Sequence, residues 1–112
     1  MFKILLIFCC FYSGQQDEPV LSWTESYKLS WQDFKSKPNL NESAVAITAS
    51  GITFEFSIRQ TNDKQVVNYN SNVEALFYPE QSWSKPNQAD EHVLEHEQLH
   101  FDIAELFARK MR

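Results

Sequence analysis

The fold depends on the run DEHVLEHEQLHFDIAELFARKMR, residues 90–112. It contains no glycine or proline, Asn87 and Asp90 are candidate N-caps, and Lys110 and Arg112 suit a C-terminal end. At about 100° per residue, the apolar residues gather within about 80° of His96. This side carries Val93, Leu99, His100, Ile103, Ala104, Phe107 and Met111. We predict a helix that turns His96 and His100 towards the core, with Glu105 and Arg109 spaced as a surface pair.

All three histidines of the chain lie in this run, and two of them form the pattern His96-Glu97-Gln98-Leu99-His100. Residues four apart on a helix share one face, about 6 Å apart along the axis. Their imidazoles can therefore converge on one Zn²⁺ at about 2.0–2.1 Å each. Glu97 lies about 100° further round, where it can act on a water without binding the metal. The pattern predicts a zinc site at His96 and His100 with Glu97 as the catalytic base. The competing interpretation is two core histidines beside a surface glutamate.

The remaining ligands of such a site are not fixed by the sequence. His92 is excluded as a partner of His100, because a straight helix separates the two by about 12 Å. Asp102 and Glu105 are predicted to point away from the metal face. A catalytic zinc normally has three protein ligands and a water. The third ligand is therefore a residue of a partner, absent, or one of five upstream candidates: Glu42, Glu55, Glu74, Tyr78 and Glu80.

Upstream of the helix, the sequence alternates between short strand-like runs and turns. Strands are expected at residues 20–29, 44–49, 52–58, 65–69 and 73–78, with Ser50-Gly51 as a connection. Ser30 and Asp33 can cap a short turn, and residues 61–64 are typical of a hairpin turn. Trp31 and Trp83 are expected in the core in preference to a substrate groove. Short strands followed by one long helix predict an α+β fold, a small antiparallel sheet packed against the C-terminal helix that carries the motif.

The amino end of the chain has the features of an export signal. Lys3 precedes an apolar run at residues 4–12, which is shorter than the roughly 20 residues that span a bilayer. We therefore expect a signal peptide at residues 1–15, a single zincin-like domain at residues 16–112, and export to the periplasm or beyond. Cys9 and Cys10 both lie in the signal, and lipoprotein anchoring at one of them is the alternative.

The charge balance narrows the range of partners. The formal net charge is −5 at pH 7, and no basic cluster is present. An acidic domain of this kind argues against binding to nucleic acid or to anionic membranes. No integral membrane span is expected, and the predicted partner is a peptide or protein substrate.

Three segments of the chain resemble a known bacterial family. They are Leu29-Ser30-Trp31-Gln32-Asp33-Phe34, Ser82-Trp83, and Leu94-Glu95-His96-Glu97-Gln98-Leu99-His100-Phe101-Asp102-Ile103-Ala104-Glu105. The resemblance is to the family catalogued as domain of unknown function 922, described as predicted secreted zinc-dependent proteases, and it spans residues 27–112. It implies a secreted zinc metallopeptidase with the His96, Glu97 and His100 motif. The alternative is a non-catalytic exported zinc-binding or interaction domain. A third ligand with an open fourth position favours the enzyme, and a closed or two-ligand site favours the alternative.

Overall fold

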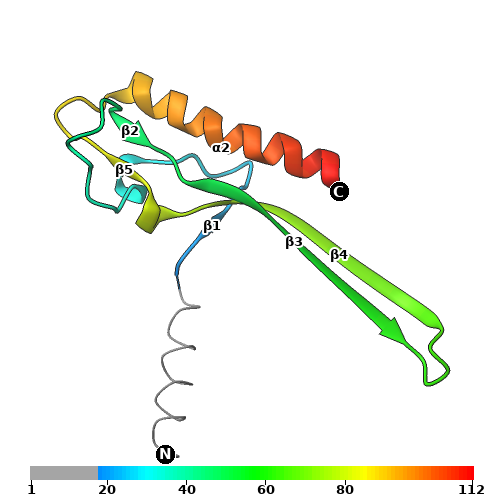
Figure 1. The fold of residues 1–112 in the computed structure, drawn as a ribbon. Helices are drawn as coiled ribbons and strands as arrows, with labels where there is room; N and C mark the ends of the chain where they lie inside the picture. Colours follow the sequence, from blue (N-terminus) through cyan, green and yellow to red (C-terminus); the bar gives the residue numbers. More distant parts are fainter. Residues whose placement is uncertain (1–17) are drawn as a thin grey trace, which may run out of the picture.

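The structure, a computed structural model, describes residues 18–112. The predicted signal peptide, with Cys9 and Cys10, lies outside the described residues. Figure 1 shows the order of the elements along the chain. They are β1 (Leu21–Ser22), η1 (Trp31–Asp33), β2 (Ala46–Ile47), β3 (Ser50–Gln60), β4 (Val66–Phe77), η2 (Pro79–Gln81), β5 (Trp83–Ser84) and α2 (Glu91–Met111).

The strands form two small antiparallel sheets. In the larger sheet β4 lies between β1 and β3, and in the smaller one β2 pairs with β5. The helix α2 packs mainly on β4 and β3. The α+β architecture, with antiparallel strands packed against one C-terminal helix, is therefore confirmed. No helix within residues 18–112 is both long enough and apolar enough to cross a bilayer.

The long helix begins and ends close to where its sequence predicts. Asp90 is the N-cap, and its side-chain oxygen accepts a hydrogen bond of 2.9 Å from the backbone N–H of Val93. At the other end, the N–H of Arg112 donates to the carbonyl of Ala108. A side-chain acceptor at the N-cap satisfies one of the backbone donors that a helix start leaves free. Asp90, rather than Asn87, takes this position.

The core lies between α2 and the second half of β4. It is a cluster of buried side chains, namely Leu29, Phe34, Val73, Ala75, Phe77, Phe101 and Ala108. The ring of Phe77 contacts Phe34 and Phe101, with centroid distances of 5.2 and 5.7 Å. Phe34 follows directly after η1, which places its ring in this cluster. The predicted cap of that turn is present, since Asp33 accepts the backbone N–H of Ser30 at 2.9 Å. Trp83 is also buried, as expected.

The face of α2 that packs on the sheet differs from the predicted one. The buried residues are Glu97, Phe101, Glu105 and Ala108, about 100° or more round the helix from His96. The predicted core side is exposed, and its large apolar residues form what we call the outer stripe: Leu99, Ile103, Leu106, Phe107 and Met111, each 42–53% exposed. The prediction was wrong because it counted apolar residues alone. The buried face combines apolar residues that fit β4 with two carboxylates that find hydrogen-bond donors.

The strands also correct the sequence analysis in three places. Residues 65–69 and 73–78 do not form separate strands, because β4 runs unbroken through the polar stretch between them. Ser50 and Gly51 are part of β3 and not a connection, and β2 pairs with β5 instead of its neighbour in sequence. Within residues 20–29 only Leu21–Ser22 is a strand. These differences arise from pairing between distant segments, which local patterns do not specify.

The turn that joins β3 to β4 is confirmed. The N–H of Thr61 donates to the carbonyl of Gln65, and Lys64 takes a left-handed conformation with φ of 65°. A register shift at Arg59/Gln60 precedes the turn. The two strands form a long hairpin that extends past the C-terminal end of α2 and away from the rest of the domain (Figure 1).

Candidate metal centre

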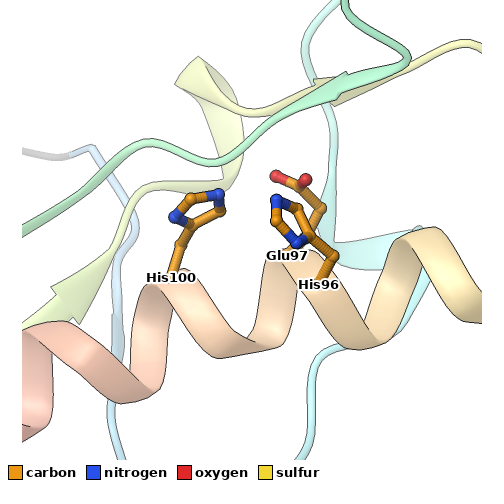
Figure 2. A group of neighbouring side chains, drawn as sticks. All are labelled: His96, Glu97 and His100. Atoms are coloured by element: carbon orange, nitrogen blue, oxygen red, sulfur yellow. The ribbon is translucent and has the colours of Figure 1, made fainter.

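His96, Glu97 and His100 project from one side of α2 towards the segment that joins β2 to β3 (Figure 2). One potential ligand atom from each of the three lies within 4.8 Å of the others. The two imidazole rings are nearly perpendicular, with an interplanar angle of 85° and a centroid distance of 4.8 Å. The helix supplies this arrangement directly, since the two histidines are one turn apart.

The donor set fits a zinc ion. Two ligands that each lie about 2.0–2.1 Å from one ion are at most about 4.2 Å apart. The observed separation of 4.8 Å or less is therefore closed by a small rotation of the imidazoles. Both histidines are exposed, contrary to the prediction that they face the core. Exposure leaves their outer side accessible from solvent. His92 is not a member of this group.

Glu97 is the buried member of the group, with only 5% of its surface exposed. Its Oε1 accepts a hydrogen bond of 2.6 Å from the hydroxyl of Thr48. Because this bond fixes the carboxylate from the sheet side, Oε2 is left to face other groups. The sequence analysis placed Glu97 at the edge of the helix face and missed Thr48. No local motif marks this threonine, because its role comes from a pairing across 49 residues.

The backbone around Thr48 is held by its neighbours. The carbonyl of Ala49 accepts the N–H of Tyr78, and the N–H of Ala49 donates to the hydroxyl of Ser82, both at 2.9 Å. Ser82 is completely buried and donates in turn to the carbonyl of Tyr78 at 2.8 Å. The loop between β2 and β3 is therefore anchored at both ends of η2. This anchoring fixes the position from which Thr48 reaches Glu97.

Glu97 has a neutral hydrogen-bond donor but no cationic partner among the side chains of residues 18–112. The ion pairs of that part of the chain both involve Glu105. A carboxylate removed from water is costly unless an opposite charge compensates it, and buried carboxylates are therefore paired or bind metals. The neighbours that can recruit such a charge are the imidazoles of His96 and His100. The site thus combines two metal-ligand side chains with a buried negative charge.

The four upstream glutamates proposed as ligands do not join this group. Among the described residues, it is the one set of three or more His, Cys, Asp or Glu side chains close enough to share an ion, and it contains neither Glu42, Glu55, Glu74 nor Glu80. Glu74 instead accepts hydrogen bonds from Ser22 and Asn72, both 2.9 Å long. Among the His, Cys, Asp and Glu side chains of residues 18–112, the third that the structure brings to the two histidines is Glu97 itself.

Polar side chains next to the site fix the rotation of the helix. Gln98 accepts the N–H of Leu29 at 2.7 Å and donates to Asp102 at 2.8 Å. Asp102 also accepts the indole N–H of Trp23 at 2.8 Å. These contacts hold the predicted solvent side of α2 against the segment that follows β1. Asp102 therefore braces the helix and is directed away from the metal group, as predicted.

Glu105 is the second buried carboxylate of α2, and it is fully paired. Arg109 and Arg112 donate to it at 2.9 and 3.0 Å. The hydrogen bonds from Arg112 lower the pKa of Glu105 by more than burial raises it, and Arg109 adds to the lowering. The predicted pair with Arg109 is confirmed, although Glu105 is buried and not at the surface. This cluster accounts for the charge of Glu105 within the protein.

No protein-family model, curated protein or solved structure matches this chain. The resemblance to the zinc-protease family therefore stays a prediction.

Proposed function

We propose that this chain is an exported zinc-dependent metallopeptidase in which His96 and His100 hold the metal and Glu97 is the general base. The observation that supports this most is the burial of Glu97 without a cationic side-chain partner, beside two imidazoles one helical turn apart. A cation bound by the two histidines compensates the negative charge of Glu97. Two histidines that bind no metal would leave this buried carboxylate uncompensated.

The chemistry follows from the placement of these side chains. Zn²⁺ bound at such a site polarises a carbonyl and lowers the pKa of a water towards about 7. Thr48 holds Oε1 of Glu97, so Oε2 would be the oxygen that takes a proton from the attacking water and passes it to the leaving amine. The exposed sides of His96 and His100 leave the site open to a peptide or protein substrate.

Metal analysis tests the assignment of the ligands. The purified chain is expected to hold about one zinc per molecule, and His96→Ala and His100→Ala are expected to lose it. With free zinc at about 100 times its dissociation constant, the free energy of unfolding rises by about 2.7 kcal/mol in the wild type and not in these variants. His92→Ala is the matched control, because His92 is exposed on the same helix but outside the group. Zinc content that is unchanged in both ligand variants would refute the proposal.

The alternative is a non-catalytic zinc-binding domain, and two observations favour it. With Glu97 as the base, no further His, Cys, Asp or Glu side chain of residues 18–112 joins the group, so the site has two protein ligands, which is the arrangement expected of the alternative. An oxygen of Glu97 belongs to the same set of atoms within 4.8 Å, so the carboxylate is close enough to be a third ligand. The zinc content of Glu97→Gln separates the two functions. A base can be replaced by an amide without loss of metal, whereas loss of a ligand lowers zinc affinity substantially. Zinc retained in this variant supports Glu97 as the base of a peptidase, and zinc lost shows that Glu97 is a ligand and removes it from the role of base.

A further inference from the structure

The hairpin of β3 and β4 has one apolar face that nothing in the described chain covers beyond its base. Phe54 pairs directly with Val73, and paired residues share a face of the sheet. Val73 is buried under α2, but the same face continues outward with exposed residues. We call this set the hairpin face: Ile52, Phe54, Phe56, Ile58 and Tyr69, which are 37–67% exposed. A two-stranded ribbon is marginally stable in water unless its apolar face packs on something.

The rings on the hairpin face are already ordered against one another. Phe54 and Phe56 are stacked with a centroid distance of 6.4 Å, and Phe56 lies 6.2 Å from Tyr69. The opposite face of the same strands is polar, with Thr53, Glu55, Ser57 and Arg59 on β3 and Asn68, Asn70 and Asn72 on β4. The hairpin face carries no charged residue. Its composition is that of a surface made for an apolar partner.

The outer stripe of α2 is a second uncovered apolar surface, and it matches the first in length. The stripe runs from Leu99 to Met111, twelve residues further along, which is about 18 Å of helix. The hairpin face runs from Ile52 to Ile58, which is about 20 Å of strand. The stripe lies about 150° round the helix from the face that packs on β4, and so it looks away from the sheet. Lys110 is the charged residue on that side, and its ammonium lies 5.3 Å from the ring centroid of Phe107.

We propose that two copies of this chain form a symmetric dimer in which the hairpin face of each copy covers the outer stripe of the other. The hairpin leaves the domain at the C-terminal end of α2 (Figure 1). Its apolar face is on the side on which α2 lies, because Phe54 pairs with Val73, which packs in the core with Phe101 and Ala108 of the helix. A twofold axis near that end lays each hairpin over the partner's helix and each helix over the partner's hairpin. Such a contact is isologous and closed.

The apolar area is sufficient for a stable dimer. The two surfaces of one chain contain ten large apolar residues that are about half exposed. At about 100 Å² for each half-exposed large side chain, they offer roughly 1,000 Å² per copy. A standard specific interface buries about 800 Å² per partner. The net charge of −5 disfavours an anionic membrane as the partner of the hairpin face. A second copy is not disfavoured in the same way, because the two surfaces that the dimer buries are almost free of charge.

The dimer also has a consequence for the metal centre. The partner's hairpin runs from Met111 towards Leu99, and its turn at residues 61–65 then lies beside the half of α2 that carries His96 and His100. The second copy therefore forms one wall of the site. This arrangement does not depend on zinc, and the dimer is expected whether or not the proposed metal is bound.

Sedimentation equilibrium with a chelator present tests the dimer. Over about a hundredfold range of protein concentration, the wild type is expected to show twice the mass of one chain. Phe56→Asp and Ile103→Asp are each expected to weaken association by at least about a hundredfold, because the twofold places two carboxylates in the apolar contact. Ser57→Asp is the matched control, since it adds the same charge to the polar face one residue away. Circular dichroism confirms that each variant is folded.

Mixing the two variants distinguishes this dimer from other pairings. In a mixed dimer of Phe56→Asp with Ile103→Asp, one of the two hairpin-to-helix contacts contains only wild-type residues. The mixture is therefore expected to recover dimer that neither variant forms alone. A dimer built from hairpin against hairpin, or helix against helix, would have a carboxylate in its contact and would not recover in this way. A monomeric wild type, a dimeric Phe56→Asp variant, or a mixture without recovery would each overturn the proposal.

Discussion

The two halves of α2 each bury one glutamate on the same face, and the two carboxylates have opposite surroundings. Glu97 and Glu105 are both 5% exposed and lie two turns apart. Glu105 receives hydrogen bonds from two arginines, so its charge is compensated inside the protein. Glu97 receives one from the neutral hydroxyl of Thr48 and faces two imidazoles. Two equally buried carboxylates therefore differ in their partners: arginines compensate the charge of Glu105, and we propose that a bound metal compensates that of Glu97.

The largest expected difference between the two positions is in catalysis. Glu97→Gln is expected to lower zinc-dependent peptide cleavage by about 10²–10⁴, the usual contribution of a positioned acid–base group. Glu105→Gln removes a carboxylate of the same size from the same face and is expected to leave cleavage within a few-fold of wild type. Rates measured on a peptide library with zinc-loaded protein provide the comparison. Equal losses in both variants would mean that Glu97 acts through folding and not as a base.

For stability, the substitution at Glu105 is expected to have the larger effect and the one at Glu97 the smaller. Glu105→Gln is expected to lower the free energy of unfolding by about 1.5–3 kcal/mol, because it weakens charge-assisted hydrogen bonds from Arg109 and Arg112. Glu97→Gln in metal-free protein is expected to have little effect or to stabilise slightly, since it removes a buried charge that has no cationic partner. Urea titrations of the two variants in chelator give the values. A large destabilisation by Glu97→Gln would show that its charge is structural after all.

The smallest expected effect is in the response to acid. The folded-state pKa of Glu105 is below its ordinary value of 4.5, so the unfolded chain binds this proton more readily. The corresponding stability is fully present above about pH 4.5 and is lost as the pH falls through the lower pKa of the folded state. Wild type is therefore expected to lose stability more steeply than Glu105→Gln on acidification below pH 4.5. Parallel curves of unfolding free energy against pH for the two proteins would contradict this assignment.

Features with local causes were predictable from the sequence. The helix start at Asp90 and the turn at residues 61–64 each depend on residues a few positions apart. The motif at residues 96–100 needs only helical geometry to bring its side chains together. The side of α2 that is buried was not predictable in this way. It is decided by partners far along the chain, among them Thr48 for Glu97 and Leu29 for Gln98.

The long hairpin also shows that local sequence patterns do not specify pairing between distant segments. Residues 68–72 read Asn-Tyr-Asn-Ser-Asn, which is a composition typical of loops, and yet they form the middle of β4. Their pairing with β3 supplies the hydrogen bonds, and their asparagines all lie on the polar face. A polar stretch therefore does not end a strand when one face of that strand is in water. The alternation of β3 was readable because its apolar residues are large and regularly spaced.

The cluster of Glu105, Arg109 and Arg112 also constrains how this sequence can vary. Replacing a whole buried ion-pair network with apolar side chains of similar volume is often neutral, whereas removing one member leaves a charge without its partner. Simultaneous replacement of all three residues is therefore expected to preserve stability, whereas replacement of one alone is not. Arg109 adds Trp23 to this set through its stacking on the indole, and Arg112 adds the backbone of Val73. Substitutions in the last turn of α2 are therefore constrained by Trp23, in the segment after β1, and by β4.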